Sequence, residues 1–222
     1  MKRLLLLLPV AFLVAITFSA CGRGARNETA VVQTSEFVVG TTPRLSVVNF
    51  GGDVDVVTGD AGRIGVELRK QSSDPDSGGA QTDLDRIKLS ATQTGDEVSV
   101  VVEYVQPKSG KVQGEHASAA MTLTVPPATV LNLVTGRGNV SVPEGAGSAN
   151  VIVANGNVAI HLPAGAAFTL GGVIGNGSVT SDFDGVKEGQ HSGPLAAVVG
   201  RQPGVDIKVS IGNGKLSLLK NR

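Results

Sequence analysis

Acidic residues stand two positions apart at four places, and these pairs are the features of the sequence best suited to chemistry. Two residues apart on a strand, both carboxylates share one face and could bind calcium together with backbone carbonyls. However, neither the full calcium-loop pattern nor the nonapeptide calcium repeat is present. We therefore interpret the pairs as solvated faces or turns and expect no metal site. The pairs are Asp53/Asp55, Asp74/Asp76, Asp83/Asp85 and Asp182/Asp184.

The three histidines are the other candidate catalytic groups. His116 and His191 lie among polar residues typical of loops, and His161 alternates with apolar Ile160 and Leu162, which predicts that it faces outward. Their spacing is not that of a zinc site, and a Gly-x-Ser-x-Gly nucleophile motif is missing. The scattered charges also do not show the cluster of acids and bases that a polysaccharide-cleaving enzyme needs. We expect no catalytic residue, no cofactor and no enzymatic activity.

A glycine-rich signature recurs as LVTGRGNVSV, VIVANGNVAI, GVIGNGSVTS and KVSIGNGKLSL, starting at residues 133, 151, 172 and 208. It resembles a phosphate-gripping dinucleotide loop superficially, but such a loop lies between a strand and a helix. Here a strand pattern continues after each glycine, and the lysine of a P-loop is missing. The signature is therefore interpreted as a structural corner, in which glycine permits positive φ and close backbone approach. The expected corner residues are Gly52, Gly138, Gly156, Gly177 and Gly214.

The N-terminus has the layout of a secretory signal peptide: a basic start, an apolar run over residues 4–18, and the small residues Ser19 and Ala20 before Cys21. The apolar run is shorter than the roughly 20 residues of a transmembrane helix. The Ser-Ala-Cys sequence resembles the bacterial lipobox, which implies that Cys21 is lipid-modified and becomes the mature N-terminus. We expect a signal peptide over residues 1–20 and a lipidated cysteine with a flexible tether over residues 21–36. The folded domain is expected over residues 37–222.

Composition favours thin, regular β-structure. Glycine occurs 30 times, aromatic residues make up 3% of the chain, and tryptophan is absent. Lys+Arg and Asp+Glu are both 19, and this zero formal charge argues against a nucleic-acid binder. From residue 45 onward, apolar and polar residues alternate with period two, which predicts an all-β domain without helices. Two polar segments, residues 71–83 and 106–119, are expected to be surface loops.

Equivalent positions in the glycine signature recur at intervals close to one or two multiples of about 20 residues. This spacing predicts a single-stranded β-helix (β-solenoid) with coils of about 20 residues, in which asparagine amides at the corners could stack between coils. A β-sandwich is the alternative. The equivalent positions are Val54, Val98, Val140, Val158, Val179 and Leu216, and the expected inward residues are Leu131, Leu133, Val140, Val142, Val151, Val153, Val158 and Ile160.

The runs LSVVNFGGDVDVVTGD, IHLPAGAAFTLGGVIGNGSVTSDF and VSIGNGKLSLLK resemble the bacterial putative-adhesin family of β-strand-repeat proteins, over most of residues 37–219. The resemblance implies a β-helix exposed outside the cytoplasm, often membrane-tethered, and it brings no catalytic residues. It favours an exported, lipid-anchored envelope scaffold or adhesin-like module, held at the outer membrane or the outer face of the cytoplasmic membrane. An envelope protein, a glycan or a host surface could be the partner. A membrane-proximal stress-sensing accessory and, less so, a polysaccharide-acting enzyme are the alternatives.

Overall fold

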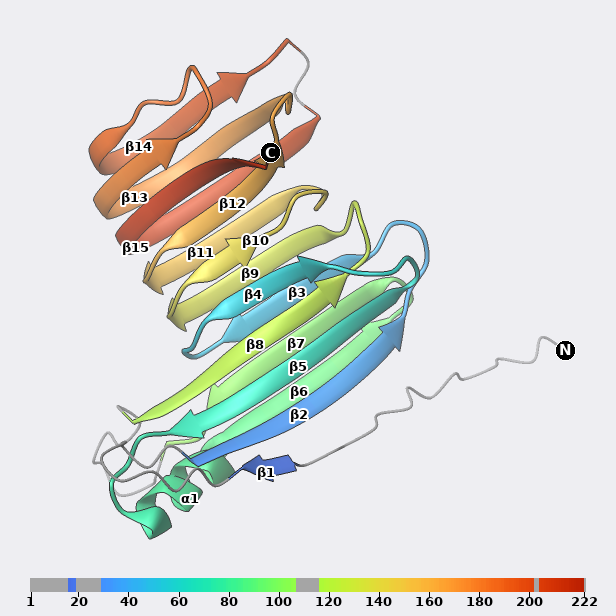
Figure 1. Ribbon diagram of the computed structural model, residues 1–222, viewed down its shortest axis with the longest axis vertical. Helices are drawn as coiled ribbons and strands as arrows, with labels where there is room; N and C mark the ends of the chain where they lie inside the picture. The colour runs from blue at the N-terminus through green and yellow to red at the C-terminus, as the bar shows by residue number, and fades with distance from the viewer. Residues whose placement is uncertain (1–15, 19–28, 107–115, 202–203, 222) are drawn as a thin grey trace, which may run out of the picture.

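The computed structural model describes residues 16–18, 29–106, 116–201 and 204–221. Figure 1 shows the strands side by side along the long axis, with β13 and β14 at one end and the helix α1 at the other. The strands are β1 (Ile16–Phe18), β2 (Thr29–Val38), β3 (Arg44–Asn49), β4 (Val54–Thr58), β5 (Arg63–Ser72), β6 (Ile87–Thr94), β7 (Glu97–Tyr104), β8 (Ala117–Val125), β9 (Val130–Arg137), β10 (Val140–Val142), β11 (Ala149–Asn155), β12 (Val158–Pro163), β13 (Phe168–Ser181), β14 (Gly189–Val199) and β15 (Val205–Asn221), and the helix is α1 (Ser77–Arg86). The expectation of an all-β domain is confirmed.

All strands belong to one sheet, which doubles back on itself at β15. The first half of β15 pairs in parallel with β11, and its second half pairs in parallel with β12. One series of strands therefore runs β7–β3–β9–β11–β15, and the other runs β5–β8–β4–β10–β12–β15. Both series contribute side chains to a single hydrophobic core.

The predicted single-stranded β-helix with coils of about 20 residues is wrong, and the β-sandwich alternative is not found either. The strands instead form a nearly closed, barrel-shaped sheet with 12 strands in its main part. Antiparallel pairs, which a single-stranded helix does not contain, join β2 to β5, β5 to β8, β6 to β7 and β13 to β14. Period-two alternation is the same in parallel and antiparallel strands, so the sequence pattern alone did not separate these arrangements.

The equivalent positions of the glycine signature lie in one row across neighbouring parallel strands. Val140 is paired with both Val54 and Val158, and Leu216 is paired with both Val158 and Val179. Val98 is the exception, since it is paired with Leu45 in the other series. The eight residues expected to point inward are all at most 2% exposed, so the predicted core positions are confirmed.

Two expectations about irregular segments require correction. Residues 71–83, expected to be a surface loop, contain the end of β5 and most of α1, which is capped by Asp76 accepting a hydrogen bond from the Gly78 amide. Helix α1 has only three buried residues and no strong apolar periodicity, which explains why the pattern did not indicate it. Residues 29–36, assigned to the tether, form part of β2. Cys21 and the rest of the expected tether lie outside the described residues.

Candidate interaction face

The acidic pairs serve local structure. Asp53 accepts hydrogen bonds from the backbone and side-chain amides of Asn139, at 2.7 and 3.2 Å. Asp74 accepts one from the Asp76 amide at the start of α1, and Asp182 accepts one from the Lys220 amide. Over the part of the chain that the structure describes, no three His, Cys, Asp or Glu side chains come together as a metal site would require.

Asp83 joins α1 to two strands. This aspartate is 5% exposed, and its carboxylate accepts hydrogen bonds from the Ser72 hydroxyl at 3.1 Å and from the Tyr104 hydroxyl at 2.7 Å. Burial, together with the hydrogen bond to Asp83, raises the pKa of Tyr104 above its ordinary value. Ser72 is the last residue of β5 and Tyr104 is the last residue of β7, so this cluster holds the helix against one strand of each series.

Replacing Tyr104 by phenylalanine should lower the free energy of unfolding by about 1–3 kcal/mol at pH 7, because a buried carboxylate loses a donor. The raised pKa means that the folded state holds the phenolic proton more tightly than the unfolded state does. The stability that this proton provides is therefore complete below about pH 10 and declines as the pH rises through the pKa of the folded state. Urea unfolding of both proteins between pH 7 and 11 measures this difference. A gap that widens with pH would contradict the assignment.

The histidines do not converge. His161 Nδ1 lies 3.2 Å from Asn221 Oδ1, and His191 Nε2 lies 2.9 Å from the Pro194 carbonyl oxygen. His116 is exposed and at the far end of the sheet, where its carbonyl accepts from the amide of Ser73. The imidazoles of His161 and His191 thus have separate local partners, and the arrangement does not resemble a nucleophile, base and orienting group in contact.

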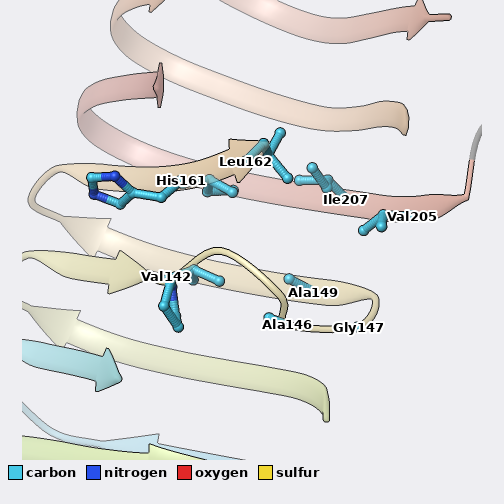
Figure 2. Close-up of a pocket in the computed structure, with 10 residues that line it drawn as sticks. Val142, Ala146, Gly147, Ala149, His161, Leu162, Val205 and Ile207 are labelled. Carbon is cyan, nitrogen blue, oxygen red and sulfur yellow. The ribbon is translucent and has the colours of Figure 1, made fainter. Parts of the chain in front are cut away.

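A small pocket lies between the loop after β10 and strands β11, β12 and β15. It is lined by apolar residues including Val142, Leu162 and Ile207, and Figure 2 shows His161 and Val205 at opposite ends of the labelled group. Its volume of about 10 Å³ accommodates no more than a single water molecule. This pocket therefore cannot hold an organic ligand.

The expected corner glycines are stacked where the chain passes from one series of strands to the other. A Cβ atom on Gly138 would overlap the carbonyl of Gly52, and one on Gly156 would overlap the carbonyl of Gly138. Gly214 stands against Gly156 and Gly177 against Gly214 in the same manner. The backbone of each corner thus passes where the side chain of the next would be, which only glycine permits.

Asparagine side chains cross between the strands beside these corners. The Asn139 carbonyl oxygen Oδ1 accepts from the backbone and side-chain amides of Asn157, at 3.1 and 3.0 Å. Asn157 Oδ1 then accepts from the amide of Lys215 at 3.0 Å. A second series runs along the outer face, where Asn150 donates to Asn132 at 2.9 Å and Asn132 donates to Ser46. These ladders hold neighbouring strands in register.

Apolar side chains, interrupted by Ser210 on β15, form a row on the outer face of the β7–β3–β9–β11–β15–β13 series, and we call this row the outer row. Val48 is paired with Val101 and with Val134, and Val134 is paired with Ile152. Ser210 follows on β15, and Val173 follows on β13. Val48, Ile152 and Val173 are 43%, 40% and 49% exposed. At about 4.8 Å per strand, the row is about 24 Å long.

The residues beside the outer row differ on its two sides. On one side, the next alternate positions of β9, β11, β15 and β13 are the small residues Gly136, Ala154, Gly212 and Gly175, and those after Val48 and Val101 are Phe50 and Glu103. On the other side lies the ladder of Ser46, Asn132 and Asn150, which Lys208 follows on β15. The opposite series has a different outward row, composed of Asp55, Ser141, Ala159, Ser217 and Thr180. The apolar row is thus a property of one face, which makes this face the candidate for interaction with a partner.

The fold is similar to that of a solved bacterial structure. A putative cell adhesion protein from Clostridium sporogenes ATCC 15579 aligns with 86% of this chain and 100% of its own, with a TM-score of 0.55 and 12% identity. A putative adhesin from Bacteroides fragilis NCTC 9343 aligns with 85% of this chain and 97% of its own, with a TM-score of 0.33 and 10% identity. No protein-family model and no curated protein matches the sequence. The first structure supports the fold alone.

Proposed function

We propose that the protein is an exported, lipid-anchored and non-enzymatic interaction module of the adhesin type, anchored through Cys21 at the cell envelope. The observation that carries this proposal is the outer row, an apolar surface on a rigid sheet whose described residues include no convergent reactive groups. Among the described residues, no helix has the length and apolar character needed to cross a membrane. The proposed attachment through a lipid on Cys21 rests on the lipobox-like Ser-Ala-Cys sequence.

The outer row has the composition of a protein–protein contact. Its centre is aliphatic and its borders carry amides and hydroxyls, as do the core and rim of many interfaces. Burial of an aliphatic side chain contributes about 1.5–3 kcal/mol when complete, and these side chains are already half covered by their neighbours. Contact along the row would therefore be shallow and individually weak. We infer a protein partner, on the envelope or on a host surface, bound through many copies of the module.

A membrane-proximal regulatory role is the second candidate, and the position of β2 favours it. Because β2 begins at Thr29, only seven residues separate the sheet from Cys21. Eight peptide steps span at most about 28 Å. A lipid on Cys21 would keep the sheet near the bilayer, where it could contact a membrane-embedded signalling protein.

The test compares two aspartate substitutions on opposite outer faces. Ile152→Asp places a charge in the outer row, and Ala159→Asp places the same charge on the opposite series. We expect saturable attachment of the labelled protein to envelopes of the producing bacterium. Attachment should be weakened at least about tenfold by Ile152→Asp, equivalent to about 1.4 kcal/mol, and changed less than about twofold by Ala159→Asp.

Urea unfolding should confirm that both aspartate variants are folded. Equal attachment of both would remove the outer row as the binding surface. If the unsubstituted protein shows no saturable attachment to envelopes or to host cells, the interaction role is wrong.

A further inference from the structure

The barrel-shaped sheet has a seam between β2 and β6. These strands stand at opposite ends of the strand order, apart from the short strand β1 on β2. Strand β2 pairs with β5 along its whole length, whereas β1 covers only Ala30, Val31 and Val32 on its other edge. Strand β6 pairs with β7 along all of its residues and has no second strand among the described residues. Strand β6, and β2 beyond the three residues that β1 covers, therefore present a backbone edge without a second strand among the described residues.

Side chains hold the two edges near each other at both ends of the seam. Gln93 Nε2 on β6 donates to the Val38 carbonyl of β2 at 2.6 Å. At the other end, Lys70 Nζ on β5 donates to the Ile87 carbonyl of β6 at 2.8 Å, and α1 contacts both β2 and β6. Because side chains rather than backbone amides make these connections, the strands are farther apart than the about 4.8 Å of a paired ladder.

Burial shows that the middle of the seam is open. On β7, Val98, Val100 and Val102 face the core and are at most 1% exposed. On the neighbouring β6, the core-facing Leu89 and Ala91 are only partly buried. Ile87 at the start of β6 is fully buried, so the loss of burial is confined to the middle of β6, where Leu89 and Ala91 pack against the core on one side only.

Strand β2 shows the same loss of burial. Leu68 and Val66 on β5 are at most 2% exposed, whereas Gln33 and Ser35, which are paired with them, are only partly buried. The Gln33 side-chain oxygen Oε1 is itself buried and has no hydrogen-bond partner among the described residues. A buried oxygen without a hydrogen bond is unfavourable, so this position favours the arrival of a hydrogen-bond donor.

We propose that the seam between β2 and β6 is a strand-accepting site, which binds an extended apolar segment of a partner protein antiparallel to β2. The structure already contains one instance of this pairing, because β1 lies antiparallel on the edge of β2. Backbone hydrogen bonds would provide affinity, and alternate side chains would enter the core beside Leu89 and Ala91. Strand β1 leaves the edge of β2 only if residues 1–20 are removed, as the proposed function requires. In this respect the inference rests on the proposed function.

The probe is a fluorescent peptide with residues 12–18, FLVAITF, flanked by lysines. In the register of β1, its first four residues would lie opposite Glu36 to Gln33. A second peptide carries the same side chains with alternate backbone nitrogens methylated, which removes strand pairing but keeps apolarity. Both are titrated into the processed protein in detergent, with micelles lacking protein as the blank. Mass spectrometry establishes the first residue of the protein, so a failure of processing is distinguished from a failure of the site.

Two arginine variants locate the site. Ala91→Arg fills the seam from the inner side of β6, whereas Thr92→Arg places the same side chain on the outer side of the next residue. We expect the peptide to bind, with a Kd raised at least about tenfold by Ala91→Arg and less than about twofold by Thr92→Arg. Equal binding of the methylated peptide, or equal Kd values for both variants, would overturn the proposal. So would a dimer of the protein that Ala91→Arg dissociates, because a second copy would then be the occupant.

Discussion

Replacing Gly156 by alanine is expected to lower the free energy of unfolding by about 3 kcal/mol or more. Gly156 has a φ of 151°, in a region that residues with a side chain rarely adopt. Its missing Cβ also points at the carbonyl of Gly138, which is part of the backbone and cannot rotate away. The methyl group must therefore separate two neighbouring strands at the corner. Guanidinium unfolding followed by far-ultraviolet circular dichroism measures the loss.

Two other glycines separate the causes of this effect. A Cβ on Gly145 has open space but a φ of 85°, so Gly145→Ala should cost about 1–2 kcal/mol from backbone conformation alone. Gly165 has open space and no positive φ, so Gly165→Ala should change stability by less than about 0.5 kcal/mol. If Gly156→Ala proves no worse than Gly145→Ala, the close approach of the corner backbones is not a constraint on stability.

The second large effect is expected from Cys21→Ser. The proposed lipid on Cys21 would be the membrane attachment, and serine cannot form the thioether that carries it. We expect the unsubstituted protein almost entirely in the membrane fraction of lysed cells. Palmitate labelling of the protein should disappear in the variant.

The location of the Cys21→Ser protein depends on whether residues 1–20 are still removed. Loss of the lipid should move the protein to the supernatant if residues 1–20 are still removed, and mass spectrometry of the N-terminus shows whether they are. An unlabelled Cys21 in the unsubstituted protein would contradict lipid anchoring. A serine variant that is cleaved yet stays bound to the membrane would show that another contact provides the attachment.

The core and the corner positions could be predicted from the sequence because both depend on local chemistry. Val151 and Val153 alternate with polar or exposed residues, and period-two alternation places one set of side chains on one face in any sheet. Gly138 and Gly156 recur next to asparagines, which marks turns in any β-fold. The core positions needed no knowledge of which strands are neighbours, and there the prediction and the structure agree.

Strand order could not be predicted, since it depends on contacts between distant segments. The antiparallel ends of the sheet require β8 to lie against β5, and nothing in the alternation of either segment specifies the direction of its neighbour. Helix α1 was missed because its apolar contact consists of Ala80 and Leu84 alone, and its third buried residue, Asp83, is polar, so no apolar stripe marks it in the sequence. The seam likewise arises only from the order of the strands.

The outer row corresponds in the sequence to pairs of adjacent apolar residues, which interrupt the alternation of apolar and polar residues. In VVNF and LVTG, Val48 and Val134 directly follow a core residue, so two adjacent apolar residues point to opposite faces. Such doublets are common in buried parallel strands, where both faces are covered. Here one of the two faces is not covered by any described residue, and the doublets indicate the outer surface. Pairing across strands was needed to show that Val48, Val134 and Ile152 lie side by side.

Protease treatment of intact cells tests the proposed function most directly, because an adhesin-type module must be exposed outside the cell. Proteinase K added to intact cells should remove the lipid-anchored protein while a cytoplasmic marker remains whole. Complete protection in intact cells, lost only when the envelope is opened, would contradict the adhesin role and favour an internal partner at the membrane.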